Sequence, residues 1–538
     1  MVNEERAPAC ISALIALVAL MPFSLSQALA QDAALQQNKV RAGQDDSRRD
    51  LIPDRWWERA GAICSILLKS LPPDAQGRAA VPPSFDPKNE AQASAYFDEL
   101  KAKGCDALLL DNPGEIAGRV YPHLATKDHY KVAPDIGSLD NFRRLVRLSH
   151  TKSLPVMIDY NLGYCSLEAP HWLKACDDVR AGRASKESKW FLWSDSPDAP
   201  PPVVHKDTFF LVRPAHLPGN KPGTSYDSKT NEVWEYSERA GRYYWSKWSG
   251  NVDGKIVRLP QYNWNSQEFQ EEAERINRFW MDTGIDGMQQ DAVSWYVGYT
   301  WEKGRQRITD VITSYGNTYL QPEGAGGFRE DPVAWITEGG WNSVQDYGLG
   351  IWWEKGSDVI GSAIESGDPR PIERALRDYH DRVVAVGGVL WKFVSARPQT
   401  LEPAKHRLIV ATVISLGNMI PMEGSSLLED PEVRWLFQTK RSRPALHQLG
   451  TRRQLPTNAD HKYYAFLRTS ADASERVLVV LNFQSAAQTV KVDLSGVATA
   501  GLVDLKDGTV CPRHNPFGVE VPAHGYRLYE VKAPIKLP

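Results

Sequence analysis

The 538-residue sequence has almost no net charge, a single long apolar run and few cysteines. Its 63 Lys and Arg residues nearly balance its 66 Asp and Glu residues, which leaves a formal charge of −3, so charge gives no reason to expect a nucleic-acid partner. The sequence also has no internal repeat, no glycine-rich nucleotide-binding loop and no spaced set of His and Cys ligands. We therefore expect no cofactor and no bound metal.

The composition is typical of a large globular protein. Apolar residues make up 42% and charged residues 24% of the chain, which excludes a disordered or fibrous protein. The chain is too long for one simple domain at roughly 100–200 residues each, so we expect one large domain with insertions or two to three domains. Tryptophan is frequent, with 18 residues, and its flat rings can fill a core or stack on sugars and bases.

The one long apolar run lies at the N-terminus and predicts an export signal. Residues Ile11 to Leu25 are mostly apolar, and the Ser-Gln-Ala-Leu-Ala that follows has small residues at Ala28 and Ala30, as at a signal-peptide cleavage site. The run is short for a membrane span, and no later stretch reaches the roughly 20 apolar residues that one needs. An uncleaved anchor is the alternative. We predict a signal peptide over residues 1–30, a flexible polar segment over 31–55, and a periplasmic or secreted mature protein.

Cleavage would remove Cys10 and leave five cysteines. An odd number requires at least one free thiol or a bond between chains. Cys165 and Cys176 lie close together in a loop-like segment, so they are the best candidates for a disulfide in an oxidising compartment. Cys64 lies in an apolar, strand-like run and is expected in the core.

Strand-like and helix-like segments alternate between residues 56 and 455. Short apolar runs such as 107–110 and 287–290 are separated by amphipathic helical patterns such as 266–282, which is typical of βαβ units and a parallel sheet. About eight such units fit an α/β fold of the (β/α)8 TIM-barrel type. The predicted domains are a barrel over 56–163 and 263–455, an inserted domain over 164–262 after the third strand, and a C-terminal antiparallel β-sandwich over 456–538.

Four acids follow predicted barrel strands: Asp111, Asp159, Asp291 and Glu323. Catalytic groups of such barrels sit at the C-terminal ends of the strands, and neighbouring strands are about 4.8 Å apart. Asp291 and Glu323 follow successive strands, so their carboxylates can flank one bond. A retaining glycosidase needs two carboxylates about 5–5.5 Å apart, one as nucleophile and one as acid/base. The alternative is structural, because such acids also cap helices or pair with Lys and Arg.

A series of longer segments adds to this pattern. They are Tyr130-Lys-Val-Ala-Pro-Asp-Ile-Gly137, Val156-Met-Ile-Asp159-Tyr-Asn-Leu162, Leu259-Pro-Gln-Tyr-Asn-Trp-Asn265, Trp280 to Asp291, and Ile414-Ser-Leu-Gly-Asn-Met-Ile-Pro421. Together they resemble glycoside hydrolase family 13, the α-amylase family, from about Trp56 to Val531. The resemblance implies the same barrel, insertion and C-terminal sandwich. It also implies a retaining glycoside hydrolase or transglycosylase that acts on an oligo- or polysaccharide without a cofactor.

The resemblance implies a role for each acid. It places Asp291 as the nucleophile, Glu323 as the acid/base, and Asp159 as the first-signature Asp that holds the sugar site together. Glu338, in Ile336-Thr-Glu-Gly-Gly-Trp341, is a rival acid, but Glu323 is preferred because it directly follows a strand. Trp295, four residues after Asp291, is expected to face the site.

The sequence departs from the family's pattern at sugar-binding positions. Gln289 stands where the family has Arg two residues before the nucleophile, and it can donate only a neutral hydrogen bond in place of a charge-assisted one worth about 1.5–3 kcal/mol. Gly163 and Tyr164 replace the Asn-His of the first signature, and with that Asn the calcium that the family often binds there loses a ligand. Phe393-Val-Ser-Ala-Arg-Pro398 has no acid where the family has Asn-His-Asp. Its Arg397 could face a carboxylate or phosphate on the substrate.

Two functions remain open from the sequence. The first is an active enzyme with an atypical −1 subsite, for which the candidate substrate contacts are Asp159, Tyr164, Gln289, Trp295, Glu338 and Arg397. The second is a catalytically silent relative that binds carbohydrate or a protein partner. Retention of all three acids favours the first. The aromatic residues of the insertion, such as Trp190 and Trp245, either wall a sugar cleft or, as we favour, form the insertion's own core.

Overall fold

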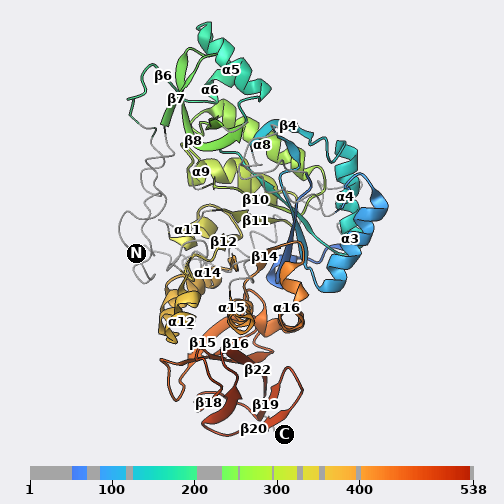
Figure 1. The fold of residues 1–538 in the computed structure, drawn as a ribbon, viewed down its shortest axis with the longest axis vertical. Coiled ribbons are helices and arrows are strands. Elements are labelled where there is room, and N and C mark those ends of the chain that lie inside the picture. Colours follow the sequence, from blue (N-terminus) through green and yellow to red (C-terminus); the bar gives the residue numbers. More distant parts are fainter. Residues whose placement is uncertain are drawn as a thin grey trace, which may run out of the picture. The chain divides into compact units, whose positions relative to one another are not determined.

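The computed structural model of the chain describes residues 51–69, 85–116, 125–200, 202, 233–252, 255–293, 296–323, 331–350, 358–394 and 401–533. Figure 1 shows their helices and strands in chain order. No helix within these ranges has both the length and the apolar character needed to cross a membrane. The predicted signal peptide and residues 31–50 lie outside the described residues.

Parallel strands form a (β/α)8 barrel. They are β1 (Ala62–Ile66), β2 (Ala107–Leu110), β5 (Val156–Tyr160), β10 (Gly287–Gln290), β11 (Tyr319–Pro322), β12 (Ser343–Gln345), β13 (Val389–Trp391) and β14 (Ile420–Glu423). Six of them are hydrogen-bonded in the order β11-β10-β5-β2-β1-β14, and β12 pairs with β13. A bridge between Trp391 and Met419 joins β13 to β14, and Ser343 Oγ donates to Leu320 O (2.8 Å) between β12 and β11. The predicted fold is therefore confirmed.

Helices connect the strands in sequence, and several begin at a side-chain cap. Ser138 and Ser266 accept hydrogen bonds from backbone N–H groups of the first turns of α4 and α8, which satisfies donors that a helix start leaves unpaired. The helices of the barrel region are η2 (Trp56–Glu58), α3 (Glu90–Lys103), α4 (Leu139–Thr151), α8 (Gln267–Met281), α9 (Trp301–Gly304), η4 (Arg305–Thr309), α10 (Asp310–Thr313), α11 (Pro332–Thr337), α12 (Val359–Ser366), α13 (Arg370–Ala375), η5 (Leu376–His380), α14 (Asp381–Ala385), α15 (Pro403–Ser415), η6 (Ser426–Glu429), α16 (Pro431–Ser442) and η7 (Pro444–Leu446).

The segment just before β1 belongs to the barrel core. Ile52, Trp56 and Trp57 are 4%, 3% and 7% exposed and pack with inward-facing strand residues such as Ile63 and Tyr319. The sequence predicted a flexible segment through residue 55, and this prediction is wrong for Ile52. A single apolar residue in a polar stretch carries too weak a pattern to predict burial, which here depends on the two tryptophans beside it.

The insertion after β5 contains helices as well as strands. They are α5 (Pro170–Arg180), α6 (Lys186–Lys189), β6 (Trp193–Ser194), β7 (Val233–Ser237), β8 (Arg242–Val252) and β9 (Lys255–Pro260), while β3 (Gly114–Ile116) pairs with β4 (Thr126–Val132) after β2. The rings of Trp172 and Trp193 stack at 5.2 Å, and Trp190 and Trp245 are each 4% exposed. These aromatic side chains therefore form the insertion's own core, as we favoured.

The predicted disulfide in the insertion does not form. Cys165 and Cys176 are both buried free thiols. The Cys165 thiol contacts the Tyr262 hydroxyl, whereas Cys176 Sγ lies 3.7 Å from Ser237 Oγ. Closeness in sequence was the wrong guide, because the Cys176 thiol of α5 lies against Ser237 of β7, whereas the Cys165 thiol contacts Tyr262.

The C-terminal domain is an antiparallel sandwich. One sheet has the order β15-β16-β17-β22-β19-β20 and the other pairs β18 with β21. Its strands are β15 (Thr451–Leu455), β16 (Tyr463–Thr469), β17 (Arg476–Asn482), β18 (Gln488–Val492), β19 (Gly501–Asp504), β20 (Val510–Pro512), β21 (Phe517–Val521) and β22 (Gly525–Lys532). Buried side chains of both sheets, among them Leu478 and Val490, form one core. Because β15 pairs with β16, the sheet begins at Thr451, five residues before the expected boundary.

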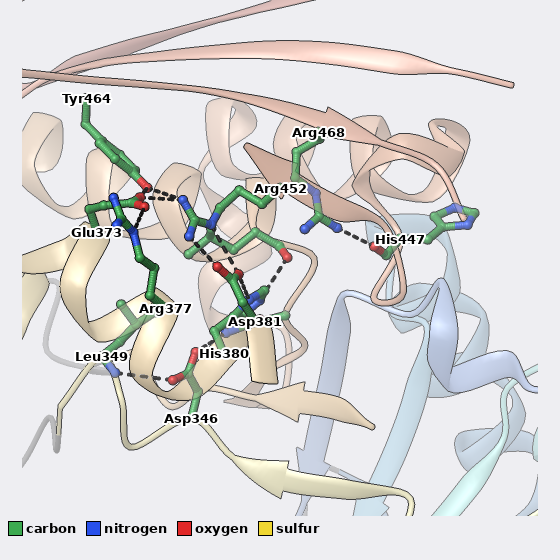
Figure 2. A network of polar contacts seen from close by, with 12 residues as sticks. Asp346, Leu349, Glu373, Arg377, His380, Asp381, His447, Arg452, Tyr464 and Arg468 are labelled. Atoms are coloured by element: carbon green, nitrogen blue, oxygen red, sulfur yellow. Dashed lines mark hydrogen bonds and ion pairs between the residues drawn. The ribbon is translucent and has the colours of Figure 1, made fainter. Parts of the chain in front are cut away.

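A buried polar network joins this sandwich to the barrel helices (Figure 2). Its centre is Arg452 of β15, whose side chain is 2% exposed and forms ion pairs with Glu373 of α13 and Asp381 of α14. Arg452 also donates to the Tyr464 hydroxyl at 2.8 Å. We call Arg452, Glu373, Asp381 and Tyr464 the Arg452 cluster. It fixes the sandwich to the barrel through charges that would be costly to bury unpaired.

Candidate active site

One row of polar side chains crosses four neighbouring barrel strands. Gln289 of β10 is in register with Asp159 of β5 and with Gln321 of β11, and the β2–β5 register places Asp111 beside Asp159. Partners in a parallel sheet point to the same face, and side chains alternate along a strand. Residues two positions earlier, such as Leu109, Met157 and Tyr319, lie in the inner core, so this row also faces the barrel interior.

A second row follows two residues later. It consists of Asn161, Asp291 and Glu323, which have the same inward-facing parity. The ladder continues past the strand ends, because Asp291 N donates to Tyr160 O (2.8 Å) and Glu323 N donates to Gln290 O (2.9 Å). Backbone hydrogen bonds alone thus fix the positions of both predicted catalytic acids. These acids lie at the C-terminal ends of the strands, as the sequence predicted.

The carboxyl groups of Asp291 and Glu323 are in hydrogen-bond contact. Burial raises the pKa of Glu323 well above its ordinary value, the negative charges of Asp291 and Asp159 raise it further, and its hydrogen bond to Asp291 acts in the same direction. The same bond acts to lower the pKa of Asp291, against the larger effect of burial. Both carboxyl groups are therefore harder to ionise than free ones, and the hydrogen bond between them favours the proton on Glu323. Two coupled carboxyl groups with one proton are the pattern that separates an acid from a nucleophile.

Two side-chain amides orient the pair. Asn161 Nδ2 donates to Asp291 Oδ2 at 2.8 Å, and Gln289 Nε2 donates to Glu323 Oε2 at 3.1 Å. The sequence left open a neutral hydrogen bond from Gln289 to the nucleophile, but in the structure Asn161 donates to Asp291 and Gln289 donates to Glu323. The sequence did not single out Asn161, although its position two residues after Asp159 on the same strand face was a usable signal.

Asp159 lies at the base of the acidic group beside a buried lysine. Burial raises its pKa well above the ordinary value, Asp291 and Asp111 raise it further, and Lys69 opposes them. Lys69 is 2% exposed, and its ammonium lies 3.7 Å from Asp111 Oδ2. Nothing in the sequence singles out Lys69, because it precedes a segment with no clear pattern.

Tyrosine rings close one side of the site. Tyr164 is 1% exposed, and Asp291, Asp159 and Glu323 all act to raise the pKa of its phenol, after the larger effect of burial. Tyr296, also 1% exposed, accepts a hydrogen bond from Leu162 N (2.9 Å) and donates to Asp291 O (3.1 Å). The structure therefore brings Tyr164 to the acids, and it adds Tyr296, which the sequence analysis missed.

The remaining predicted site residues lie elsewhere or outside the described residues. Glu338 is exposed and follows α11, and its N–H closes that helix on Ala334 O (2.9 Å). It precedes β12 and thus lies at the end of the barrel where strands begin, opposite Asp291. Trp295 and Arg397 are outside the described residues. In the described ranges no group of three or more His, Cys, Asp or Glu side chains could hold a metal ion.

Comparisons with known proteins agree with this fold. A model described as "Alpha amylase, catalytic domain" matches residues 123–321, and one described as "Maltogenic Amylase, C-terminal domain" matches residues 453–528. Among solved structures, α-amylase from H. orenii has a TM-score of 0.63 at 18% identity, covering 88% of this chain and all of that one. α-Amylase from Geobacillus thermoleovorans has a TM-score of 0.60 at 16% identity, covering 88% and 99%.

Curated relatives match a smaller part of the chain. A probable alpha-glucosidase of Rhizobium meliloti is 24% identical over 248 residues, which is 46% of this chain and 38% of that protein. A probable oligo-1,6-glucosidase of Bacillus subtilis is 25% identical over 203 residues, 36% of this chain and 29% of that one. The chain thus spans less than two fifths of the length of either relative. The two family segments, the barrel and the C-terminal sandwich together support a divergent member of the α-amylase family, glycoside hydrolase family 13.

Proposed function

We propose that the protein is a retaining glycoside hydrolase or transglycosylase that acts on α-linked oligosaccharides. Asp291 is the nucleophile and Glu323 the acid/base. The observation that carries this proposal is the hydrogen-bond contact between the two carboxyl groups at the ends of the neighbouring strands β10 and β11, a contact that favours the proton on Glu323 and the charge on Asp291. Inverting enzymes keep their carboxyl groups about 6.5–9.5 Å apart to admit water between them, so a direct contact favours retention.

The names of the relatives support the substrate class. The relatives include an alpha-glucosidase, a probable oligo-1,6-glucosidase and a trehalose-6-phosphate hydrolase. We propose that Asp159, Gln289 and Tyr164 form the −1 subsite with the pair, with Asn161 taking the part of the hydrogen-bond donor to the nucleophile. Trp295 and Arg397 are further candidate contacts on the sequence alone.

The test uses two substrates that differ in leaving group. Asp291→Asn should abolish turnover of both a malto-oligosaccharide and a dinitrophenyl α-glucoside. Glu323→Gln should lose about 10³-fold on the oligosaccharide but much less on the dinitrophenyl glycoside, because that leaving group departs without a proton. NMR of the first product should show the α-anomer.

The pH profile gives a second readout. The acid must be protonated, so kcat/KM should fall as the pH rises through the raised pKa of Glu323, and this basic limb should be absent from Glu323→Gln with the dinitrophenyl substrate. Glu338→Gln tests the rival acid. A loss in Glu338→Gln that matches the one predicted for Glu323→Gln would transfer the acid role to Glu338, and a β-product would exclude retention.

A silent carbohydrate-binding relative is the second candidate, and the departures at Gln289 and Gly163 are what favour it. Calorimetry with malto-oligosaccharides separates the two functions. Binding by a wild-type protein that turns over neither substrate would establish the binder and exclude the enzyme.

We propose in addition that the protein is exported, on the evidence of the N-terminal apolar run alone. The mature chain should begin at Gln31, after Ala30. Mass spectrometry of the protein recovered from a periplasmic or culture fraction checks this. An intact N-terminus in those fractions would point to an uncleaved anchor.

A further inference from the structure

The acidic end of the barrel contains a lysine that the proposed chemistry does not use. Lys69 follows β1, is 2% exposed, and donates to Asn112 O. Its Nζ lies 3.7 Å from Asp111 Oδ2, while the preceding residue, Leu68, donates its N–H to Asp111 Oδ1 at 2.7 Å. Leu68 and Lys69 thus face the two oxygens of Asp111, Leu68 with a hydrogen bond and Lys69 with an ion pair. Lysine is rarely this buried without such a partner.

Asp111 connects this lysine to the site. The register Leu110–Ile158 between β2 and β5 puts Asp111 next to Asp159. Asp159 Oδ1 is buried and accepts no hydrogen bond from any group in the described parts of the chain. A carboxylate oxygen that is buried without a donor makes ionisation of the group costly unless a cation is near.

The charges around Asp159 show why its ionisation requires a nearby cation. Asp111 lies on one side, Asp291 on the other, and Lys69 is the cation that opposes them. Glu323, Tyr164 and Tyr296 also face this group, and each becomes harder to ionise because of Asp159. Asp159 therefore lies among acids that oppose its ionisation.

We propose that Lys69 is a positioning residue of the active site. Its ammonium lies 3.7 Å from Asp111 Oδ2 and supplies the positive charge that favours ionisation of Asp159 between two other acids. Lys69 does not touch the reacting atoms in this proposal. It acts through Asp111 and through its own charge. In this way it sets the charge of the acidic residues Asp111 and Asp159 next to which the substrate is bound.

The first test does not depend on activity. Protonation of Asp159 is linked to stability, because a folded-state pKa above the unfolded one costs stability once the pH rises above the unfolded value. Removing Lys69 raises the folded pKa of Asp159 further, so Lys69→Met should lose stability at pH 7. Asp159→Asn, which removes the charge, should raise the Tm more in the Lys69→Met background than in the wild-type background. This extra gain should fade as the pH falls below about 4, the ordinary pKa of Asp, because Asp159 then becomes protonated in the folded and in the unfolded state.

A matched control separates charge from packing. Lys440 is fully buried at a distance from the acids, with its Nζ 3.4 Å from Arg59 O, and burial lowers its pKa to about 7. Lys440→Met also removes a buried ammonium, yet Asp159→Asn should give only its wild-type gain in that background. An equal gain from Asp159→Asn in all three backgrounds would overturn the proposal. If Lys69→Met does not fold, Asp111→Asn replaces it, and there Asp159→Asn should gain less than in wild type.

The second test rests on the proposed function. With the dinitrophenyl α-glucoside, the midpoint of the acid limb in the pH profile of kcat/KM should move to a higher pH by about one unit in Lys69→Met. It should return to the wild-type pH in Lys69→Arg. It should move down in Asp111→Asn, because the repulsion from Asp111 is lost while Lys69 remains. Shifts in the same direction for Lys69→Met and Asp111→Asn, or none, would assign the pair a structural role only. A wild-type protein without turnover would refute the proposed function, while the thermal test would still decide the role of Lys69.

Discussion

Replacing Arg452 with Leu should destabilise the protein by about 3 kcal/mol. Removing one partner of a buried ion pair costs about 3–5 kcal/mol, because the other charge stays buried without compensation. Two carboxylates would lose a partner, but neither would be left alone. Glu373 keeps Arg377 at 2.6 Å and Asp381 keeps His380 Nδ1 at 3.2 Å. We therefore expect the lower end of that range.

Urea unfolding followed by tryptophan fluorescence measures this loss. None of the 18 tryptophans lies after Trp435, so the fluorescence reports mainly the barrel and the insertion, and Trp435, which stacks on Tyr526 of β22, is the tryptophan that also senses the sandwich. At a slope of about 3 kcal/mol per molar urea, a loss of about 3 kcal/mol lowers the midpoint by about 1 M. A shift in this signal would show that the Arg452 cluster stabilises the barrel from the sandwich side.

Arg453 provides the matched control. Its side chain is exposed and donates to Gly496 O at 2.9 Å, so Arg453→Leu should change stability by less than about 0.5 kcal/mol. A midpoint for Arg452→Leu within about 0.2 M of the control, less than about 0.6 kcal/mol at that slope, would refute the reasoning. The buried pairs would then contribute no more than an exposed arginine.

Two further predictions concern the barrel and the insertion. A Cβ at Gly287 would lie 2.2 Å from Tyr319 O of the neighbouring strand β11. Gly287→Ala should therefore lower the free energy of unfolding by about 3 kcal/mol, the upper end for overpacking. It should also lower any turnover, because Glu323 directly follows β11. A Cβ at Gly518 meets nothing within 4 Å, so Gly518→Ala should leave the Tm unchanged in a thermal melt. Equal Tm losses for Gly287→Ala and Gly518→Ala would contradict this prediction. Because Cys165 and Cys176 are free, a reducing agent should leave the Tm unchanged, and a lower Tm under reduction would indicate a disulfide.

The pattern of the sequence was sufficient to predict the barrel. Alternation of short apolar runs with amphipathic helices follows from burial of each strand on both faces, and this local requirement can be read without knowing the partners. The same reasoning placed Asp159, Asp291 and Glu323 at strand ends, because every parallel strand presents its C-terminal end on one side of the sheet. The resemblance to the family then assigned them roles.

Other features depended on contacts between segments distant in sequence. The burial of Ile52, the separate partners of Cys165 and Cys176, and the distance of Glu338 from the site arise from packing that no local pattern encodes.

The site shows most clearly which features the sequence determined and which the tertiary structure decided. The sequence determined which acids end which strands. Only the tertiary structure decided that Asn161 and not Gln289 donates to Asp291, and that Lys69 faces Asp111 beside Asp159. Hydrogen bonds and pKa values depend on distances of a few ångströms between side chains on different strands, and strand register, which fixes those distances, is a property of the folded sheet.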